Sequence, residues 1–122
     1  MPRRPERLAE TLRAEIGEVV GFELDDPRLV SVTVTDVVVA DDLRDAKVYV
    51  LIDGSEAEVA QAMKALQAAT PFVRRQVAMN MSLKYVPLIH FARDTAEENA
   101  ARVNELLSGL NTQGETNEKE EG

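Results

Sequence analysis

The sequence predicts a single α+β domain in which helices cover one side of a three-stranded sheet. Strand-forming residues dominate three stretches, at positions 30–39, 46–52 and 84–92. Apolar residues recur at helical spacing in four others, at 6–21, 55–69, 71–81 and 95–109. Three strands cannot bury both sheet faces unaided, so helices must pack on one of them. The predicted order is α-β-β-α-kink-α-β-α.

The first helix is expected over residues 6–21 and to stop at Gly21. Its apolar positions keep helical spacing: Leu8, Leu12, Ile16, Val19 and Val20. A loop should follow at Asp26-Pro27, because the residue before a proline is pushed out of the helical conformation.

The next two stretches are predicted to pair as a hairpin. From Val30 to Thr35, valines alternate with hydroxyl residues, and the β-rich pattern runs on to Val39. The second strand is expected over residues 46–52. The polar linker at 40–45 is short, which favours antiparallel pairing.

A helix should begin at Ser55, three residues before Glu58, the spacing of a capping box. Thr70-Pro71 is predicted to interrupt it, because proline costs about 3 kcal/mol inside a helix but is favourable in a first turn. A second helix should then resume at Phe72. The positions expected to face inward are Val59, Met63, Leu66, Phe72, Val73, Val77 and Met81.

The third strand is predicted over residues 84–92, with Pro87 near its start. Thr95 and Glu98 form a second capping-box spacing, and a last helix should end near Gly109. Residues 111–122 contain no apolar side chain and are expected to be a disordered acidic tail. The folded domain is therefore expected to span residues 1–110.

The composition excludes several classes of protein. The chain has no cysteine, so disulfides, thiolate nucleophiles and cysteine metal sites are absent. No apolar run approaches the roughly 20 residues that span a bilayer, and no signal-peptide core follows Met1. We expect a soluble cytoplasmic monomer with no membrane contact and no small-molecule substrate.

The net charge of −8 argues against nucleic acid as a partner, but the charges are unevenly distributed. Residues 64–93 contain no acid. Their five cations are Lys64, Arg74, Arg75, Lys84 and Arg93. The first seven residues add Arg3, Arg4 and Arg7 against one acid, Glu6. The pattern indicates an acidic protein with a basic region.

The predicted kink at Thr70-Pro71 is a candidate phosphate site. A helix N-terminus offers unpaired N–H groups to an anion, and Arg74 and Arg75 would add charge beside it. KH domains clamp single-stranded nucleic acid with a GXXG loop at such a position, although no GXXG occurs here. The alternative is that Pro71 only starts a packed helix and both arginines are solvated.

Several motifs together resemble the ribosome-binding factor A family over roughly residues 3–110. They are Asp26-Pro27-Arg28, the run from Val32 to Val37, the run from Asp42 to Val50, the run from Leu66 to Arg74, the run from Leu83 to Phe91, Asp94, and Leu106-Leu107. The resemblance implies a type II KH-like fold in which an Ala-x-Gly kink replaces GXXG. Ala69 would be the kink alanine, and Pro71 departs from the usual glycine.

The resemblance also implies a function. Members of that family bind the small (30S) ribosomal subunit late in its assembly and assist maturation of the 5′ end of 16S rRNA. They act without catalysis and matter most in the cold. The residues expected to contact RNA are Arg3, Arg4, Arg7, Arg28, Lys64, Ala69, Thr70, Arg74, Arg75 and Lys84. Arg74 and Arg75 are expected to be exposed, so that their replacement leaves the melting temperature nearly unchanged.

Two other classes of function stay open at this point. A KH-like module could recruit a protein through an exposed sheet edge without touching RNA. A small enzyme would need its acidic loops, Asp25-Asp26 and Asp41-Asp42, or His90, the only histidine. Neither acid pair has a nucleophile–base partner and both suit solvated turns. We therefore expect no catalytic residue, no metal and no cofactor.

Overall fold

The computed structural model describes residues 4–97 and 99–102. The elements, in chain order, are α1 (Arg4–Glu18), β1 (Val32–Val39), β2 (Asp45–Ile52), α2 (Glu56–Met81) and β3 (Leu88–Arg93). A π-helical turn (Val19–Glu23) extends α1, and a 3-10 turn (Pro27–Leu29) precedes β1. Residues 96–97 and 99–102 are helical too. The expected end of that helix, Glu98 of its capping box and the acidic tail lie outside the described residues.

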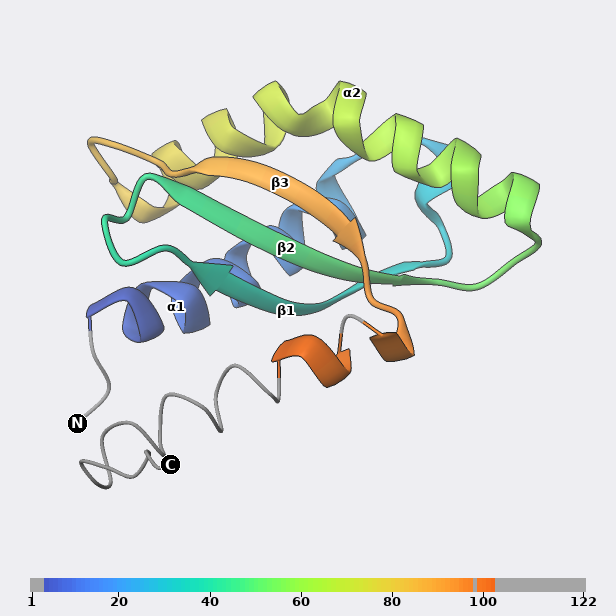
Figure 1. The fold of residues 1–122 in the computed structure, drawn as a ribbon. Coiled ribbons are helices and arrows are strands. Elements are labelled where there is room, and N and C mark those ends of the chain that lie inside the picture. The colour runs from blue at the N-terminus through green and yellow to red at the C-terminus, as the bar shows by residue number, and fades with distance from the viewer. Residues whose placement is uncertain (1–3, 98, 103–122) are drawn as a thin grey trace, which may run out of the picture.

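The three strands form one sheet with β2 in the centre, so the predicted α+β class is confirmed (Figure 1). β1 and β2 pair antiparallel as a hairpin. Its turn contains Leu43 at φ 64°, whose N–H donates to the carbonyl of Ala40 at 2.8 Å. β3 pairs with β2 in parallel, and the connection between them is α2, as parallel neighbours require.

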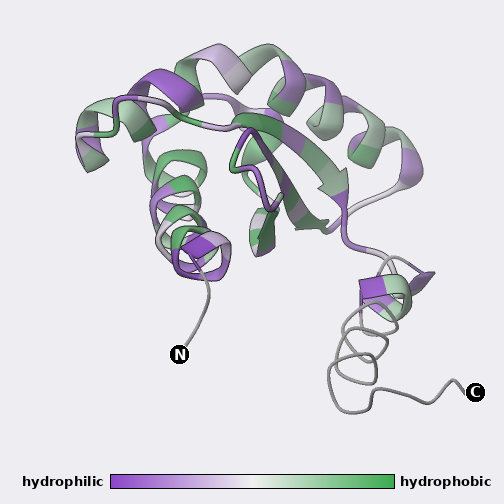
Figure 2. Ribbon diagram, turned by 60° about the vertical axis from the view of Figure 1, so that its left-hand side comes forward, coloured by the Kyte–Doolittle hydropathy of each residue, from purple (hydrophilic) through white to green (hydrophobic). Residues whose placement is uncertain are grey.

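The core lies between the sheet and the two long helices. The largest fully buried side chains come from α1 with its π-turn, from β2 and from α2: Leu12, Ile16, Val19, Val48, Val50, Leu66, Val73 and Val77. Figure 2 shows the strands mostly hydrophobic, whereas the helices alternate between hydrophobic and hydrophilic residues. This is the pattern of helices that bury one face. The predicted inward positions of both helices are confirmed as buried or partly buried.

A β-bulge changes which residues of β1 face the core. The register with β2 shifts between Val34 and Asp36. Before the bulge Val32 is buried, whereas beyond it Val37 and Val39 are buried and Val38 is exposed. One extra residue in a strand reverses the facing of all later side chains. The predicted alternation of valines and hydroxyl residues holds for Val32 to Val34 within β1, and the bulge that follows was not predicted from the sequence.

The predicted interruption at Thr70-Pro71 is also wrong, because α2 is one continuous helix with Pro71 inside it. Proline removes one N–H donor and crowds the carbonyl four residues earlier, that of Gln67. Leu66 and Val73 on either side are nevertheless fully buried. The Thr70 hydroxyl donates to the carbonyl of Leu66 at 2.9 Å. Packing on both sides thus carries the helix through the proline, and Figure 1 shows α2 arching over the sheet.

Three predicted boundaries need correction. The first helix continues past Gly21 as a π-turn to Glu23, because Gly21 does not adopt the positive φ of a glycine cap. β1 starts at Val32, which leaves Val30 85% exposed. β3 starts at Leu88 and not at residue 84, because Pro87 has no N–H to donate. By contrast, the capping box at Ser55 and Glu58 is confirmed, with bonds of 2.8 and 3.2 Å.

Candidate nucleic-acid interface

An open hollow of about 760 Å³ lies where three segments meet. The segments are the first turns of α1, the β1–β2 turn and the chain between α2 and β3. Four cations and one acid line it: Arg4, Arg7, Arg44, Lys84 and Asp42. The remaining lining is mainly apolar and includes Leu8, Leu43, Met81 and Leu83.

Local structure explains why these cations converge. Arg4 and Arg7 are three residues apart on α1, so they share one side of the helix. The N–H of Arg44 donates to Asp42 Oδ1 at 3.0 Å, which closes the turn. The carbonyl of Arg44 accepts the N–H of Leu88 at 2.9 Å. The hairpin turn is thereby tied to the start of β3, beside the segment that carries Lys84.

The chain reverses sharply after α2. Ser82 adopts the left-handed conformation, at φ 53°, and the N–H of Leu83 donates to the carbonyl of Ala78 at 3.1 Å. Arg74, inside α2, bonds to the chain that returns after this turn. Its Nη2 donates to the carbonyl of Val86 at 2.8 Å, and its Nε donates to that of Pro87 at 3.3 Å. Arg74 is half-buried, so the expectation that it is a freely exposed cation is wrong. Its guanidinium fixes the returning chain against α2.

A second hollow, of about 330 Å³, adjoins the first. It is lined by Pro71, Arg74, Arg75, Ala78, Lys84 and Val86, with no acid among them. Lys84 lines both hollows. We call the combined surface the basic groove and define it by six cations: Arg4, Arg7, Arg44, Arg74, Arg75 and Lys84. Within residues 4–97 and 99–102, its one lining acid is Asp42.

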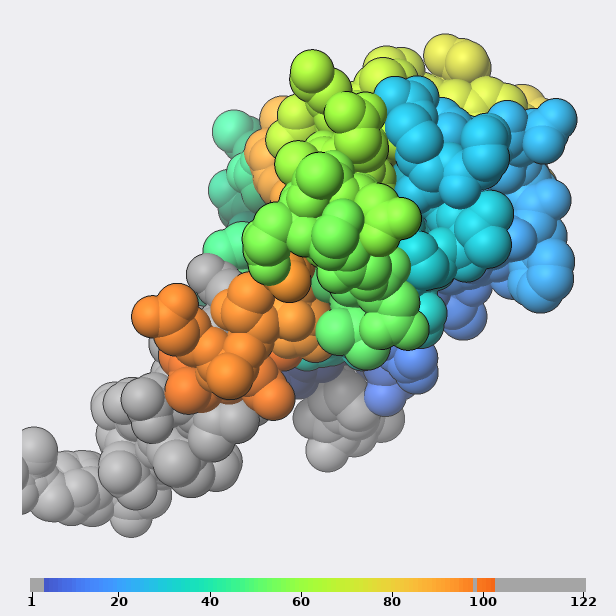
Figure 3. Space-filling view, turned by 90° about the vertical axis from the view of Figure 1, so that its right-hand side faces the viewer, coloured from blue at the N-terminus to red at the C-terminus, as the bar shows by residue number. Residues whose placement is uncertain are grey.

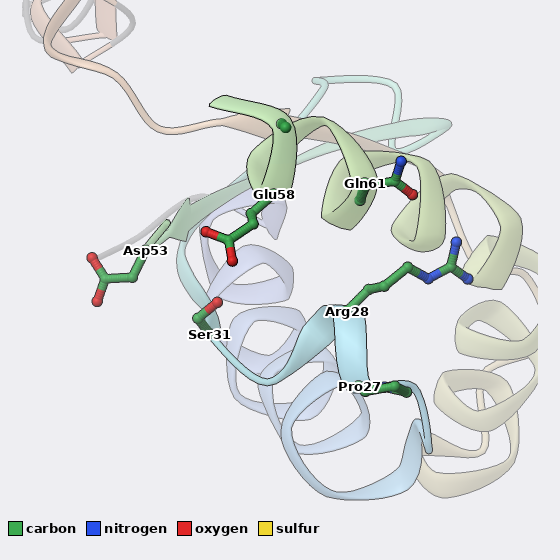
Figure 4. Close-up of a pocket in the computed structure, with 7 residues that line it drawn as sticks. Pro27, Arg28, Ser31, Asp53, Glu58 and Gln61 are labelled. Carbon is green, nitrogen blue, oxygen red and sulfur yellow. The ribbon is translucent and has the colours of Figure 1, made fainter. Parts of the chain in front are cut away.

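Arg28 lies elsewhere. It lines a different hollow, of about 370 Å³, between the 3-10 turn and the start of α2, together with Asp53 and Glu58. Figure 3 shows this side, where the first turns of α2 lie beside the cyan segment that carries Arg28. In Figure 4 Arg28 extends beneath α2, and Glu58 points toward Ser31. The acids there make this hollow a poor phosphate site.

The charge of Arg28 is already engaged by Asp26. Arg28 Nε and Nη2 donate to the two carboxylate oxygens of Asp26 at 3.0 and 2.7 Å, and the backbone N–H of Arg28 donates to Oδ1 at 2.9 Å. The side-chain bonds from Arg28, followed by its backbone bond, lower the pKa of Asp26. The side-chain bonds to Asp26 and its negative charge raise the pKa of Arg28. The paired bonds between the Arg28 guanidinium and the Asp26 carboxylate close the loop before β1.

The remaining predicted contact residues differ in whether they line the basic groove. Lys64 is exposed on α2 but lines neither hollow of the groove. Ala69 and Thr70 are half-buried and do not line the groove, whereas their neighbour Pro71 does. Arg3 lies outside the described residues. The structure therefore brings together Arg4, Arg7, Arg74, Arg75 and Lys84.

Sequence reasoning missed two residues of this surface. Arg44 stands among Asp41, Asp42 and Asp45, and that acidic surrounding hid a cation that the turn directs to the groove. Tyr85 also lines the larger hollow. It follows Lys84 in a stretch that was interpreted as strand, although it is 81% exposed in a connecting segment. An aromatic residue directly after a lysine in the acid-free stretch was the available signal.

Three of the residues weighed for catalysis have structural partners. His90 Nε2 lies 2.9 Å from Asp45 Oδ1, where the two form an exposed pair. Asp26 and Asp42 each accept the N–H of the residue two positions later, as expected of turns. Within residues 4–97 and 99–102, no cluster of His and acids could hold a metal. No helix in the same residues is long and apolar enough to cross a membrane.

The fold and the groove define a class of protein. A three-stranded sheet carries α1 and the long α2 on one side, and cations gather where α2 turns back toward β3. This is a small KH-like α+β protein with a basic groove. The family model of ribosome-binding factor A matches residues 4–107, and the chain belongs to that family.

Relatives and solved structures agree with this assignment. A ribosome-binding factor A from Desulfitobacterium hafniense is 43% identical over 117 residues, which cover 96% of this chain and 94% of that protein. The crystal structure of ribosome-binding factor A from Thermus thermophilus superimposes with a TM-score of 0.66 at 25% identity, covering 75% of this chain and 97% of the other. A homology model of the factor from the same species, fitted into the cryo-EM map of a 30S complex, gives 0.60 at 26% identity, covering 69% and 88%.

Proposed function

We propose that this protein binds the small ribosomal subunit through 16S rRNA, in the cytoplasm, and assists late maturation of the subunit. The finer role is help with processing of the 5′ end of 16S rRNA, without catalysis and with most effect in the cold. Membership of the family supports the assembly role, and the related protein in a 30S complex supports the partner.

One observation carries the proposal for this chain. Among the residues that the structure describes, the basic groove presents six cations and one lining acid, in a protein whose net charge is −8. Phosphate contacts supply most of the non-specific affinity for nucleic acid, and they fix orientation without reading sequence. Acidic residues elsewhere would repel RNA from the other surfaces. The ribosomal site would therefore be selected by shape and by the direction of approach.

Arg7 and Arg13 provide a matched test. Both are exposed arginines of α1, but only Arg7 lines the groove. We propose to compare Arg7→Glu with Arg13→Glu by co-sedimentation with purified small subunits and with whole ribosomes. Wild type and Arg13→Glu should be recovered on free small subunits and poorly on whole ribosomes. Arg7→Glu should be largely lost from both.

Two results would contradict the proposal. If wild type were recovered on whole ribosomes as well as on free small subunits, it would have no preference for an assembling subunit. If Arg7→Glu and Arg13→Glu were recovered equally, the basic groove would not be the binding surface. That result would then favour the alternative, a KH-like module that recruits a protein without direct RNA contact. That alternative would place binding on another surface, such as a sheet edge.

A further inference from the structure

Tyr85 presents an open aromatic ring in the basic groove. Its side chain is 81% exposed and lines the larger hollow together with Arg4, Arg44 and Lys84. The chain's other tyrosine, Tyr49, is buried at 4% exposure. A single exposed aromatic residue is ordinary on a protein surface. What distinguishes Tyr85 is the set of cations around it and the way its backbone is held.

The segment that carries Tyr85 is anchored at both ends. On one side, Leu83 is bonded to α2 through the carbonyl of Ala78 at 3.1 Å. On the other, Arg74 holds the carbonyls of Val86 and Pro87, and Pro87 is buried. Leu83 and Val86 are half-buried on either side of the exposed ring. The ring is thus kept in solvent by its neighbours' packing and is not a loose loop tip.

Cations lie around the Tyr85 ring, and one of them, Lys84, lies over one of its faces. Lys84 Nζ lies 5.7 Å from the ring centroid, as in a cation–π contact. That contact occupies one face of the ring. Proteins that bind single-stranded nucleic acid combine a basic track for phosphates with aromatic rings on which bases stack. An RNA-binding protein of this kind recognises bases that are unpaired and splayed out.

We infer that Tyr85 is a stacking platform for one unpaired base of single-stranded RNA, whose flanking phosphates lie against the cations of the groove. The inference rests on the proposed function and extends it from phosphate contact to base contact. A polyanionic occupant is favoured over a protein because, in the described part of the chain, four cations and only one acid line the hollow around the ring.

The chain allows a direct optical test, because it contains two tyrosines and no tryptophan. In a Tyr49→Phe background, tyrosine fluorescence comes from Tyr85 alone. A short oligouridylate should quench this fluorescence on binding. An abasic oligonucleotide of the same length has the same backbone charge but no base to stack. It should bind without quenching, as followed by anisotropy of an end label.

Affinity for oligouridylate gives the second readout. Tyr85→Ala should weaken binding by roughly 5-fold to 150-fold, the range for loss of one base–aromatic stack. Tyr85→Phe keeps the ring and should bind like wild type. Both variants should melt as wild type does, because the side chain is exposed.

Failure of the inference can be told apart from failure of the proposed function. If oligouridylate binds without quenching, and Tyr85→Ala binds as tightly as wild type, stacking is refuted while the electrostatic groove stands. If oligouridylate does not bind, the same variants are sedimented with small subunits. Loss with Tyr85→Ala and recovery with Tyr85→Phe then support stacking, and equal recovery overturns it. If wild type binds neither probe, the proposed function fails and the inference with it.

Discussion

The guanidinium carbon of Arg102 lies 3.8 Å from the centroid of the Tyr49 ring. Tyr49 alternates with the core residues Val48 and Val50, so it faces the side of the sheet opposite α1 and α2. Arg102 Nη2 also donates to Asp94 Oδ1 at 2.9 Å. Asp94 Oδ2 in turn accepts the hydroxyl of Thr35 at 2.6 Å. The segment after β3 is therefore fastened to the second face of the sheet.

Replacing Arg102 should destabilise the fold. We expect Arg102→Ala to lower the free energy of unfolding by about 2 to 3 kcal/mol, because a hydrogen-bonded cation and its stacking are lost from a side chain that is 12% exposed. Arg93→Ala is the control. Its partner Glu56 is 86% exposed, so the loss should stay below about 1 kcal/mol. Urea unfolding measures both, and equal losses would contradict the assigned role.

Arg74 and Arg75 should differ in their effects on stability, although they are adjacent. Arg74→Ala leaves the carbonyls of Val86 and Pro87 without their donor and should lower the free energy of unfolding by about 1 to 3 kcal/mol. Arg75 is exposed, and its guanidinium lies 5.9 Å from the Phe72 ring centroid, so Arg75→Ala should change it by about 0.5 kcal/mol at most. Thermal melts of the two variants check this, and coincident curves would refute it.

The Asp26–Arg28 pair predicts a pH dependence. Arg28 lowers the pKa of Asp26 below its ordinary 3.8, so the folded state favours the ionised carboxylate. The resulting stabilisation is fully present above pH 3.8 and is lost as the pH falls through the lower folded pKa. An NMR titration of the Asp26 carboxyl carbon should give a value below 3.8.

Arg28→Met tests the cause of that shift. It removes the side-chain donors but keeps the backbone N–H, so the pKa of Asp26 should return only part of the way. An unchanged Asp26 titration in this variant would show that Arg28 is not the cause.

Binding to a single-stranded rRNA fragment should weaken steeply with salt. Six phosphate contacts imply a slope of about −4 in a plot of log affinity against log salt concentration. Arg7→Glu should reduce that slope by about 0.7, and Arg13→Glu should leave it unchanged. Anisotropy titrations between roughly 50 and 200 mM salt measure it. A flat response of the wild type would eliminate the electrostatic account of the groove.

A chain stopped after Asn111 should fold normally. The removed residues hold four glutamates, one lysine and no apolar side chain, so they have nothing to contribute to a core. The melting transition should coincide with that of the full chain. RNA binding at low salt should be slightly tighter, because the acidic tail no longer competes for the groove. A lower melting temperature would mean that the domain extends beyond residue 110.

Where local chemistry decides a feature, the sequence predicted it. The capping box at Ser55 and Glu58 needs only residues three positions apart, and it is present. The buried faces of α1 and α2 follow from helical spacing alone. The family resemblance came from short motifs in the right order, and the family match confirms it. The proposed domain limits and tail remain predictions.

Tertiary structure decided which basic residues share a surface. The prediction from the sequence placed Arg28 and Lys64 on the same surface as Arg7 and left out Arg44. Arg44 reaches the groove because its carbonyl pairs with Leu88, 44 residues later. Arg28 lies outside the groove because the fold places it beside Asp53 and Glu58, although its bond to Asp26 is local. The bulge in β1 and the continuity of α2 through Pro71 have the same origin. Pairing and packing between distant segments outweigh local preference, and a linear pattern does not contain those distances.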